Sequence, residues 1–136
     1  MAFLPENGRR VCVPGHPRPQ MQRDQWTSLD GLWEFALDTR AEFSRPEQIV
    51  WKTHILVPFA PETAASGVED TGFFCAVWYR RAFEPPALKP GERLMLHFGA
   101  VDYAATVWVN GVRVCEHEGG YTVSYTHLTL PTKRIV

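Results

Sequence analysis

The residues best suited to chemistry are Glu116, His117 and Glu118, which follow one another near the C-terminal end of the chain. Paired carboxylates can divide the roles of general acid and general base, and histidine can exchange a proton near neutral pH. Glu116 and Glu118, however, are two residues apart in a stretch of alternating polarity, which places both on one face of a strand. This arrangement is more typical of a solvated edge than of a catalytic pair, so we expect no catalytic residue in this chain.

Other motifs for catalysis or metal binding are missing from the sequence. It contains no glycine-rich phosphate loop, no HExxH helix, no nucleophile elbow and no CxxC pair. Four histidines, His16, His54, His97 and His117, lack the spacing of metal ligands. The sequence therefore predicts no metal site and no cofactor.

The two glutamates end a stretch, Leu94 to Tyr121, that predicts a β-hairpin. Alternating residues flank Asn110 and Gly111, the pair best suited to a two-residue turn because both turn positions need a positive φ. Neither face of the strand before the turn is simply polar, so other segments must cover both. One face carries Ala105, Val107 and Val109, and the other carries Ala104, Thr106 and Trp108. We predict that Val109 pairs with Val112.

Upstream, the sequence predicts further strands separated by turn signals, the pattern of an antiparallel sandwich or barrel. A strand beginning at Gly31 should direct its Trp33 face inward, and a short helical turn fits between Thr39 and Gln48. The stretch from Pro58 to Gly72 is interpreted as a surface loop that is flexible rather than functional. An immunoglobulin-type sandwich fits poorly, because its tryptophan should not follow so closely on a cysteine. Other strands are expected over Ile55 to Val57, Ala76 to Glu84, and Leu94 to Phe98, the last after a turn at Pro90 and Gly91.

Alternation along Ala76 to Glu84 places Arg80 and Arg81 on opposite faces, so at least one arginine should be partly buried. A buried guanidinium requires an acidic partner. We predict Asp102 as that partner.

Composition excludes several classes of protein. The chain has 136 residues, 45% of them apolar and 21% charged, with a formal charge of −1, which fits one soluble domain and gives no reason to expect a nucleic acid or an anionic membrane as partner. No apolar run approaches the ~20 residues of a membrane span. Cys12, Cys75 and Cys115 form no disulfide or zinc pattern, and the start MAFLPENGRR lacks an apolar signal region. A reducing, cytoplasmic location is expected.

Four runs, in order, resemble the N-terminal sugar-binding domain of glycoside hydrolase family 2, the family of β-galactosidases, β-glucuronidases and β-mannosidases. Ordered blocks over roughly His16 to Thr122 are more specific than any single motif. The runs are HPRPQMQRDQWTSLDGLWEFALD at 16–38, IleLeuValPro at 55–58, WYRRAFEPP at 78–86, and FGAVDYAATVWVNG with HEGGYT between 98 and 122.

The resemblance implies an all-β fold, a galactose-binding-like jelly-roll β-sandwich that is truncated at its C-terminal end. It implies a parent enzyme with a carbohydrate substrate, a retaining mechanism and two catalytic glutamates in a later barrel, so this fragment alone should be inactive. It also implies immunoglobulin-like and barrel domains as partners in the same chain and a homo-oligomeric parent.

The resemblance further implies candidate substrate-binding residues. In longer β-galactosidases an acidic residue after the hairpin reaches toward the sugar, and Glu118, with His117 beside it, is the nearest match. The register places Gly119 at that acidic position, however, and a turn that uses the conformational freedom of Gly119 and Gly120 is the favoured alternative.

Three regions are expected along the chain. Residues 1–25, which are rich in proline and arginine, form an extended arm, and residues 26–122 form a partial sugar-binding β-sandwich domain. Residues 123–136 resemble the translation of a sequencing adapter and are interpreted as non-native, so Tyr125 and His127 receive no role. Because this tail has high β propensity, it can form a strand without belonging to the domain.

The leading functional hypothesis is a non-catalytic domain of a family 2 enzyme acting on β-galactosides or β-glucuronides. A stand-alone carbohydrate-binding module and a non-catalytic interaction domain are the alternatives. A free-standing binder should present exposed aromatic rings beside polar groups, whereas an enzyme domain should present apolar outer faces to its partner domains. The position of Trp108 opposite a valine-rich face favours the enzyme domain.

Overall fold

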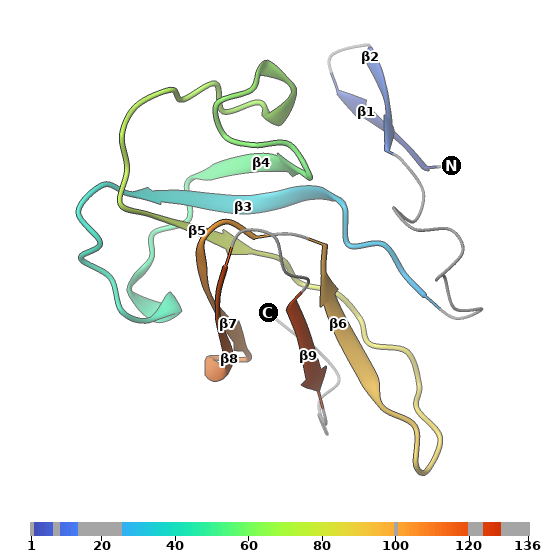
Figure 1. The fold of residues 1–136 in the computed structure, drawn as a ribbon. Helices are drawn as coiled ribbons and strands as arrows, with labels where there is room; N and C mark the ends of the chain where they lie inside the picture. Colours follow the sequence, from blue (N-terminus) through green and yellow to red (C-terminus); the bar gives the residue numbers. More distant parts are fainter. Residues whose placement is uncertain (1, 7–8, 14–25, 100, 120–123, 129–136) are drawn as a thin grey trace. The chain divides into compact units, whose positions relative to one another are not determined.

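The structure, a computed structural model, describes residues 2–6, 9–13, 26–99, 101–119 and 124–128. Over these ranges it is antiparallel β with two short 3-10 helices and no α-helix (Figure 1), as the sequence predicts. The strands are β1 (Ala2–Glu6), β2 (Arg9–Val13), β3 (Gly31–Asp38), β4 (Thr53–Val57), β5 (Ala76–Arg80), β6 (Leu94–Phe98), β7 (Ala104–Val109), β8 (Val112–Glu118) and β9 (Ser124–Leu128), and the 3-10 helices are η2 (Pro46–Gln48) and η3 (Ala64–Ser66).

The chain divides into two units, each with its own sheets. The first contains Met1–Glu42 and Val50–Tyr79, and the second contains Phe43–Ile49 and Arg80–Val136. Strands β4, β3 and β5 form a three-stranded sheet in that order, and three strand pairs, β1-β2, β6-β9 and β7-β8, form the others. Among the described residues, no helix has the length and apolar character needed to cross a membrane.

The first unit is built around β3, and the predicted inward face of this strand is confirmed. Phe35 is 1% exposed and Trp33 is half-buried, whereas Leu32, on the other face, is 46% exposed. Trp33 pairs with Ile55 of β4, which is fully buried. The ring of Tyr79 on β5 meets that of Phe35 edge to face, with centroids 5.1 Å apart. Aromatic and branched side chains thus provide the apolar area that stabilises this sheet.

Asp38, the last residue of β3, is a buried acid, and its burial does not follow from the sequence pattern. It is 3% exposed, and its carboxylate accepts the backbone N–H of Glu42 at 2.9 Å and the indole N–H of Trp78 at 3.4 Å. Burying a carboxylate is costly unless hydrogen bonds replace its hydration. These two bonds therefore tie the turn after β3 to strand β5.

The stretch from Pro58 to Gly72 is more ordered than the flexible loop predicted from sequence. Its centre is η3, where the buried hydroxyl of Ser66 donates to the carbonyl of Thr63 at 2.7 Å and accepts the N–H of Val68 at 3.0 Å. The N–H of Asp70 donates to the carbonyl of Pro61 at 3.1 Å. Polar groups inside the loop satisfy one another, which composition alone did not indicate.

The expectation for the two arginines is confirmed only in part. Arg80 and Arg81 are both half-buried, but β5 ends at Arg80, before the predicted end at Glu84. Asp102 is exposed, and the ion pairs found between described residues, Arg40–Glu42 and Arg113–Glu116, do not include it. The prediction that Asp102 neutralises a buried arginine is therefore not confirmed.

The second unit has its core at the end of β7. Val109 is 2% exposed and packs against Phe83, Leu94 and Leu96. The strand predicted over Leu94 to Phe98 is β6, in which His97 is exposed and the other residues are half-buried. The partner strand of β6 is β9, which lies in the C-terminal tail. The two strands pair from Leu94↔Leu128 to Phe98↔Ser124.

Within residues 1–25, β1 and β2 form an antiparallel pair with Ala2 opposite Val13 and Glu6 opposite Arg9. The composition predicts extended chain here but not this pairing. The HisProArgPro run at 16–19 lies outside the described residues.

Candidate functional site

The β7–β8 hairpin positions the candidate site, and its turn is the one predicted from sequence. Asn110 has φ 51° and Gly111 has φ 77°, and Val109 pairs with Val112 across them. A β-carbon on Gly111 would lie 2.8 Å from Oε1 of Glu47 on η2. Glycine therefore satisfies both the left-handed backbone and the close approach of a second segment.

A β-bulge, which the sequence did not reveal, interrupts the hairpin between Val107 and Trp108. Val107 lies opposite Cys115 and Trp108 lies opposite Arg113, so Val114 is the additional residue. The bulge brings Arg113 to the same face as Glu116, where Nη1 and Oε1 form an ion pair at 2.5 Å. Both side chains are more than half exposed, so Glu116 belongs to a solvated ion pair.

The candidate binding residues, Glu118 and His117, lie at the open end of this hairpin. Glu118 is opposite Ala104 and is exposed, and His117 is opposite Ala105 and is half-buried. Consecutive residues of a strand point to opposite faces. The structure therefore places the two candidates next to each other along the strand but does not bring them together on one face.

Beyond Glu118 the backbone supports the turn alternative. Gly119 has φ 136°, a conformation that favours glycine, while Gly120 lies outside the described residues. The N–H of Gly119 donates to the carbonyl of Tyr103 at 2.6 Å. This hydrogen bond continues the pairing of the two strands by one residue beyond the pair formed by Ala104 and Glu118.

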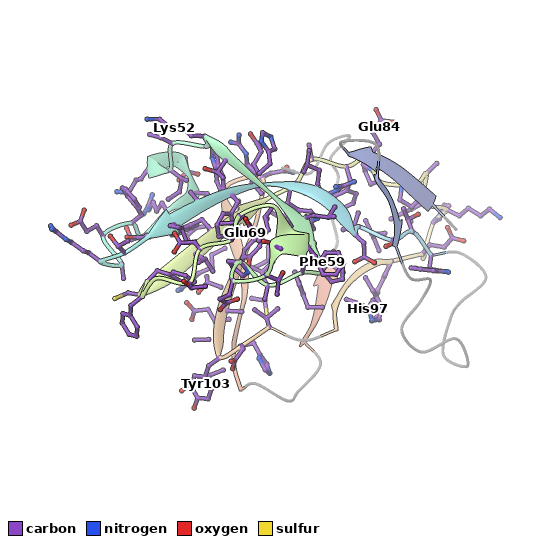
Figure 2. All side chains as sticks on the ribbon, turned by 90° about the horizontal axis from the view of Figure 1, so that it is seen from above. Lys52, Phe59, Glu69, Glu84, His97 and Tyr103 are labelled. Atoms are coloured by element: carbon purple, nitrogen blue, oxygen red, sulfur yellow. The ribbon has the colours of Figure 1, made fainter. Side chains whose placement is uncertain are left out.

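The same hydrogen bond places Tyr103, and Asp102 before it, at the open end of the hairpin. Neither residue was predicted as a site residue. Tyr103 is 61% exposed, and Asp102 is exposed as well. Figure 2 shows the side chain of Tyr103 projecting outward, away from the strands. The signal in the sequence was an acidic residue and an aromatic residue directly before a strand, but their proximity to Glu118 depends on the hairpin register.

The groups gathered at the open end of the hairpin are an exposed aromatic ring and exposed carboxylates. An exposed aromatic ring and exposed carboxylates can contact the C–H and O–H groups of a polyhydroxylated ligand. Across the described part of the chain, no group of three or more histidine, cysteine, aspartate or glutamate side chains could hold a metal ion.

Comparison with known proteins identifies the chain's relatives. It is 34% identical to a β-glucuronidase of Canis lupus familiaris over 119 residues, which cover 78% of this chain and 18% of that protein. A β-glucuronidase of Paenibacillus borealis is 32% identical over 68% of this chain and 16% of its own length. No family model matches the chain.

Solved structures agree with these relatives. The β-glucuronidase of Faecalibacterium prausnitzii superposes with a TM-score of 0.63 and 29% identity, covering 85% of this chain and 21% of that chain. A β-glucuronidase of an uncultured Clostridium gives a TM-score of 0.57 at 26% identity, over 79% of this chain. These comparisons confirm the predicted fold class, an all-β sandwich domain.

The chain thus spans about a fifth of the length of the relatives it matches, 18% for the canine protein, and the resemblance inferred from its four sequence runs is confirmed. It belongs to glycoside hydrolase family 2, as a fragment homologous to part of the β-glucuronidases.

Proposed function

We propose that this chain is the N-terminal, non-catalytic sugar-binding and structural domain of a retaining glycosidase that acts on β-glucuronides or β-galactosides. The observation that carries the proposal is the 34% identity to a β-glucuronidase over 78% of this chain but only 18% of that enzyme. A domain of this kind supports a catalytic barrel elsewhere in the parent enzyme.

The acids of the hairpin are consistent with a role outside the reaction centre. A retaining glycosidase needs two carboxyl groups about 5 to 5.5 Å apart, one as acid and base and one as nucleophile. Glu116 is engaged in a solvated ion pair with Arg113, and Glu118 lies exposed at the strand end. We propose Glu118 and His117 as candidate sugar contacts, from opposite faces of β8, rather than as groups that cleave a bond.

Several side chains support contacts with further immunoglobulin-like and barrel domains of the same polypeptide and with other subunits of a homo-oligomer. Phe73 is 93% exposed, Val50 67% and Val112 63%, so each of these apolar side chains is accessible to another domain. The indole N–H of Trp108 is buried with no acceptor in the described part of the chain. An acceptor from another domain would satisfy it.

An exposed free thiol at Cys75 fits a reducing cytoplasm.

The proposal is tested by assaying two proteins with chromogenic β-glucuronide and β-galactoside substrates: the 136-residue chain and the complete protein encoded at its locus. We expect no turnover by the chain and turnover of one substrate by the complete protein. Turnover by the chain above a mock purification would overturn the non-catalytic assignment.

A stand-alone carbohydrate-binding module is the second candidate, favoured by the exposed ring of Tyr103 beside acidic groups. The gene sequence after Thr122 separates the two candidates. A reading frame that continues into further domains supports the enzyme, and one that stops supports the module.

A further inference from the structure

The turn of the β7–β8 hairpin places an asparagine directly before a glycine at an exposed position. Asn110 has φ 51° and Gly111 has φ 77°, and both residues are exposed. An asparagine followed by glycine is especially prone to lose its side-chain amide, because glycine has no β-carbon to hinder a reaction at its backbone nitrogen. The sequence contains one other such pair, Asn7 and Gly8, and no further asparagine.

Loss of the amide requires only water and proceeds through a cyclic imide. The backbone nitrogen of Gly111 gives up its proton and attacks Cγ of Asn110, so that a Cγ–N bond forms. The Cγ–Nδ2 bond breaks, and Nδ2 leaves with that proton as ammonia. Water then opens the resulting succinimide at one of its two carbonyl groups. Opening at Cγ leaves aspartate at position 110, and opening at the main-chain carbonyl leaves isoaspartate, in which the main chain runs through the side-chain carbons.

The geometry of the folded turn opposes this ring closure. A two-residue hairpin turn with positive φ at both positions is of type I′, in which ψ of the first residue is about +30°. In an L-residue with this ψ, the nitrogen of the next residue lies on the opposite side of the Cα–C bond from the β-carbon. The nitrogen of Gly111 therefore cannot reach Cγ of Asn110 until the turn opens.

Packing beside the turn determines how readily it opens. Val109, which directly precedes the turn, is 2% exposed and packs against three apolar side chains of the second unit. On the other side of the turn, Oε1 of Glu47 lies 2.8 Å from the place that a β-carbon on Gly111 would take. Opening the turn therefore disturbs buried and close contacts, and the free energy of this local opening limits the rate of the reaction.

We propose that Asn110 is a site of spontaneous deamidation by water, and that opening of the β7–β8 turn sets the rate of this modification. Isoaspartate lengthens the main chain, so the two-residue turn that pairs Val109 with Val112 is lost. Both products also carry a new negative charge beside Gly111, which Glu47 approaches, and like charges repel. Deamidation thus converts a brief opening of the turn into its lasting disruption.

The test follows deamidation of the 136-residue chain at neutral pH by mass spectrometry of tryptic peptides, which also works if the chain associates. Residues 94–113 carry Asn110 and residues 1–9 carry Asn7, so the two sites are measured separately. In concentrated urea both asparagines should react at similar rates, because the unfolded chain contains no turn. In buffer without urea, Asn110 should react at least about tenfold more slowly than in urea. Enzymatic methylation of isoaspartate identifies the product.

Two matched variants test whether packing beside the turn limits the reaction. Val109→Ala should raise the rate at Asn110 in buffer by up to about thirtyfold, because loss of buried methyl groups makes opening of the turn more favourable. Val112→Ala changes the paired residue, which is 63% exposed, and should alter this rate by less than about threefold. Neither substitution should change the rate at Asn110 in urea.

Equal rates at Asn110 in buffer and in urea would overturn the proposal, as would the absence of reaction at Asn110 in urea. Equal rates in buffer for Val109→Ala and Val112→Ala would overturn the role of the turn. If Val109→Ala fails to fold, the comparison of the unsubstituted chain in buffer and in urea still decides. These measurements involve neither sugar binding nor turnover, so their outcome is independent of the proposed function.

Discussion

Tyr79 shows how a single side chain couples the first unit to pH. Its ring packs edge to face on Phe35, yet the residue is still 40% exposed. Burial raises the pKa of Tyr79 above its ordinary value of 10.0, and the negative charge of Glu62 raises this pKa further. Both effects disfavour the phenolate, so the folded state favours the neutral phenol.

Because the pKa of Tyr79 is raised in the folded state, the contribution of the neutral phenol to the stability of the fold is fully present below pH 10.0, the ordinary pKa. This contribution is lost as the pH rises through the pKa of Tyr79 in the folded state. We therefore expect Tyr79→Phe to reduce the fall in the free energy of unfolding between about pH 9 and 11. Glu62→Gln should lower the pKa of Tyr79 by removing its smaller cause. Urea unfolding across this range checks the expectation, with Tyr103→Phe as the control. An unchanged alkaline fall in Tyr79→Phe would contradict it.

At the scale of elements, the β7–β8 hairpin contains two paired valines in opposite environments. Val109 is 2% exposed and packs against Phe83, Leu94 and Leu96, whereas its partner Val112 is 63% exposed. The pair is a matched test of whether packing or strand propensity stabilises the hairpin.

We expect Val109→Ala to lower the free energy of unfolding by about 2 kcal/mol, because it removes two buried methyl groups and leaves a cavity. Val112→Ala should cost less than about 0.5 kcal/mol, as for other exposed substitutions. Thermal or urea unfolding followed by circular dichroism measures both. Equal costs would show that the core around Val109 contributes little.

For the whole molecule, the sheets formed by the described residues are small. Strands β7 and β8 form a two-stranded sheet, and β6 pairs with β9 from the tail. Two-stranded sheets are marginal on their own, and open strand edges offer N–H and C=O groups to other chains. Exposed apolar side chains such as Phe73 add to this tendency.

We therefore expect the isolated chain to be poorly soluble or self-associated, and removal of residues 123–136 to increase association because β6 loses the pairing that β9 provides. Light scattering after size-exclusion chromatography of both versions gives the mass. A stable monomer with a cooperative melt in either version would show that the missing parts of the parent protein contribute less to stability than we propose.

The sequence by itself determined the features that depend on neighbouring residues. The turn at Asn110 and Gly111 follows from the backbone that these two residue types allow, and the inward face of β3 follows from the period of two along a strand. The all-β fold class and the family resemblance were likewise predictable from the sequence, because turn signals and ordered motifs are local properties of the chain.

Only the tertiary structure decided which distant groups meet. The bulge that adds Val114 to β8 brings Arg113 to Glu116, and the hairpin register places Tyr103 beside Gly119. The buried hydroxyl of Ser66 and the bonds to Asp38 likewise depend on partners that no pattern in the sequence specifies. Side-chain burial and hydrogen-bond partners result from packing across strands, so residue spacing predicted the elements but not the composition of the site.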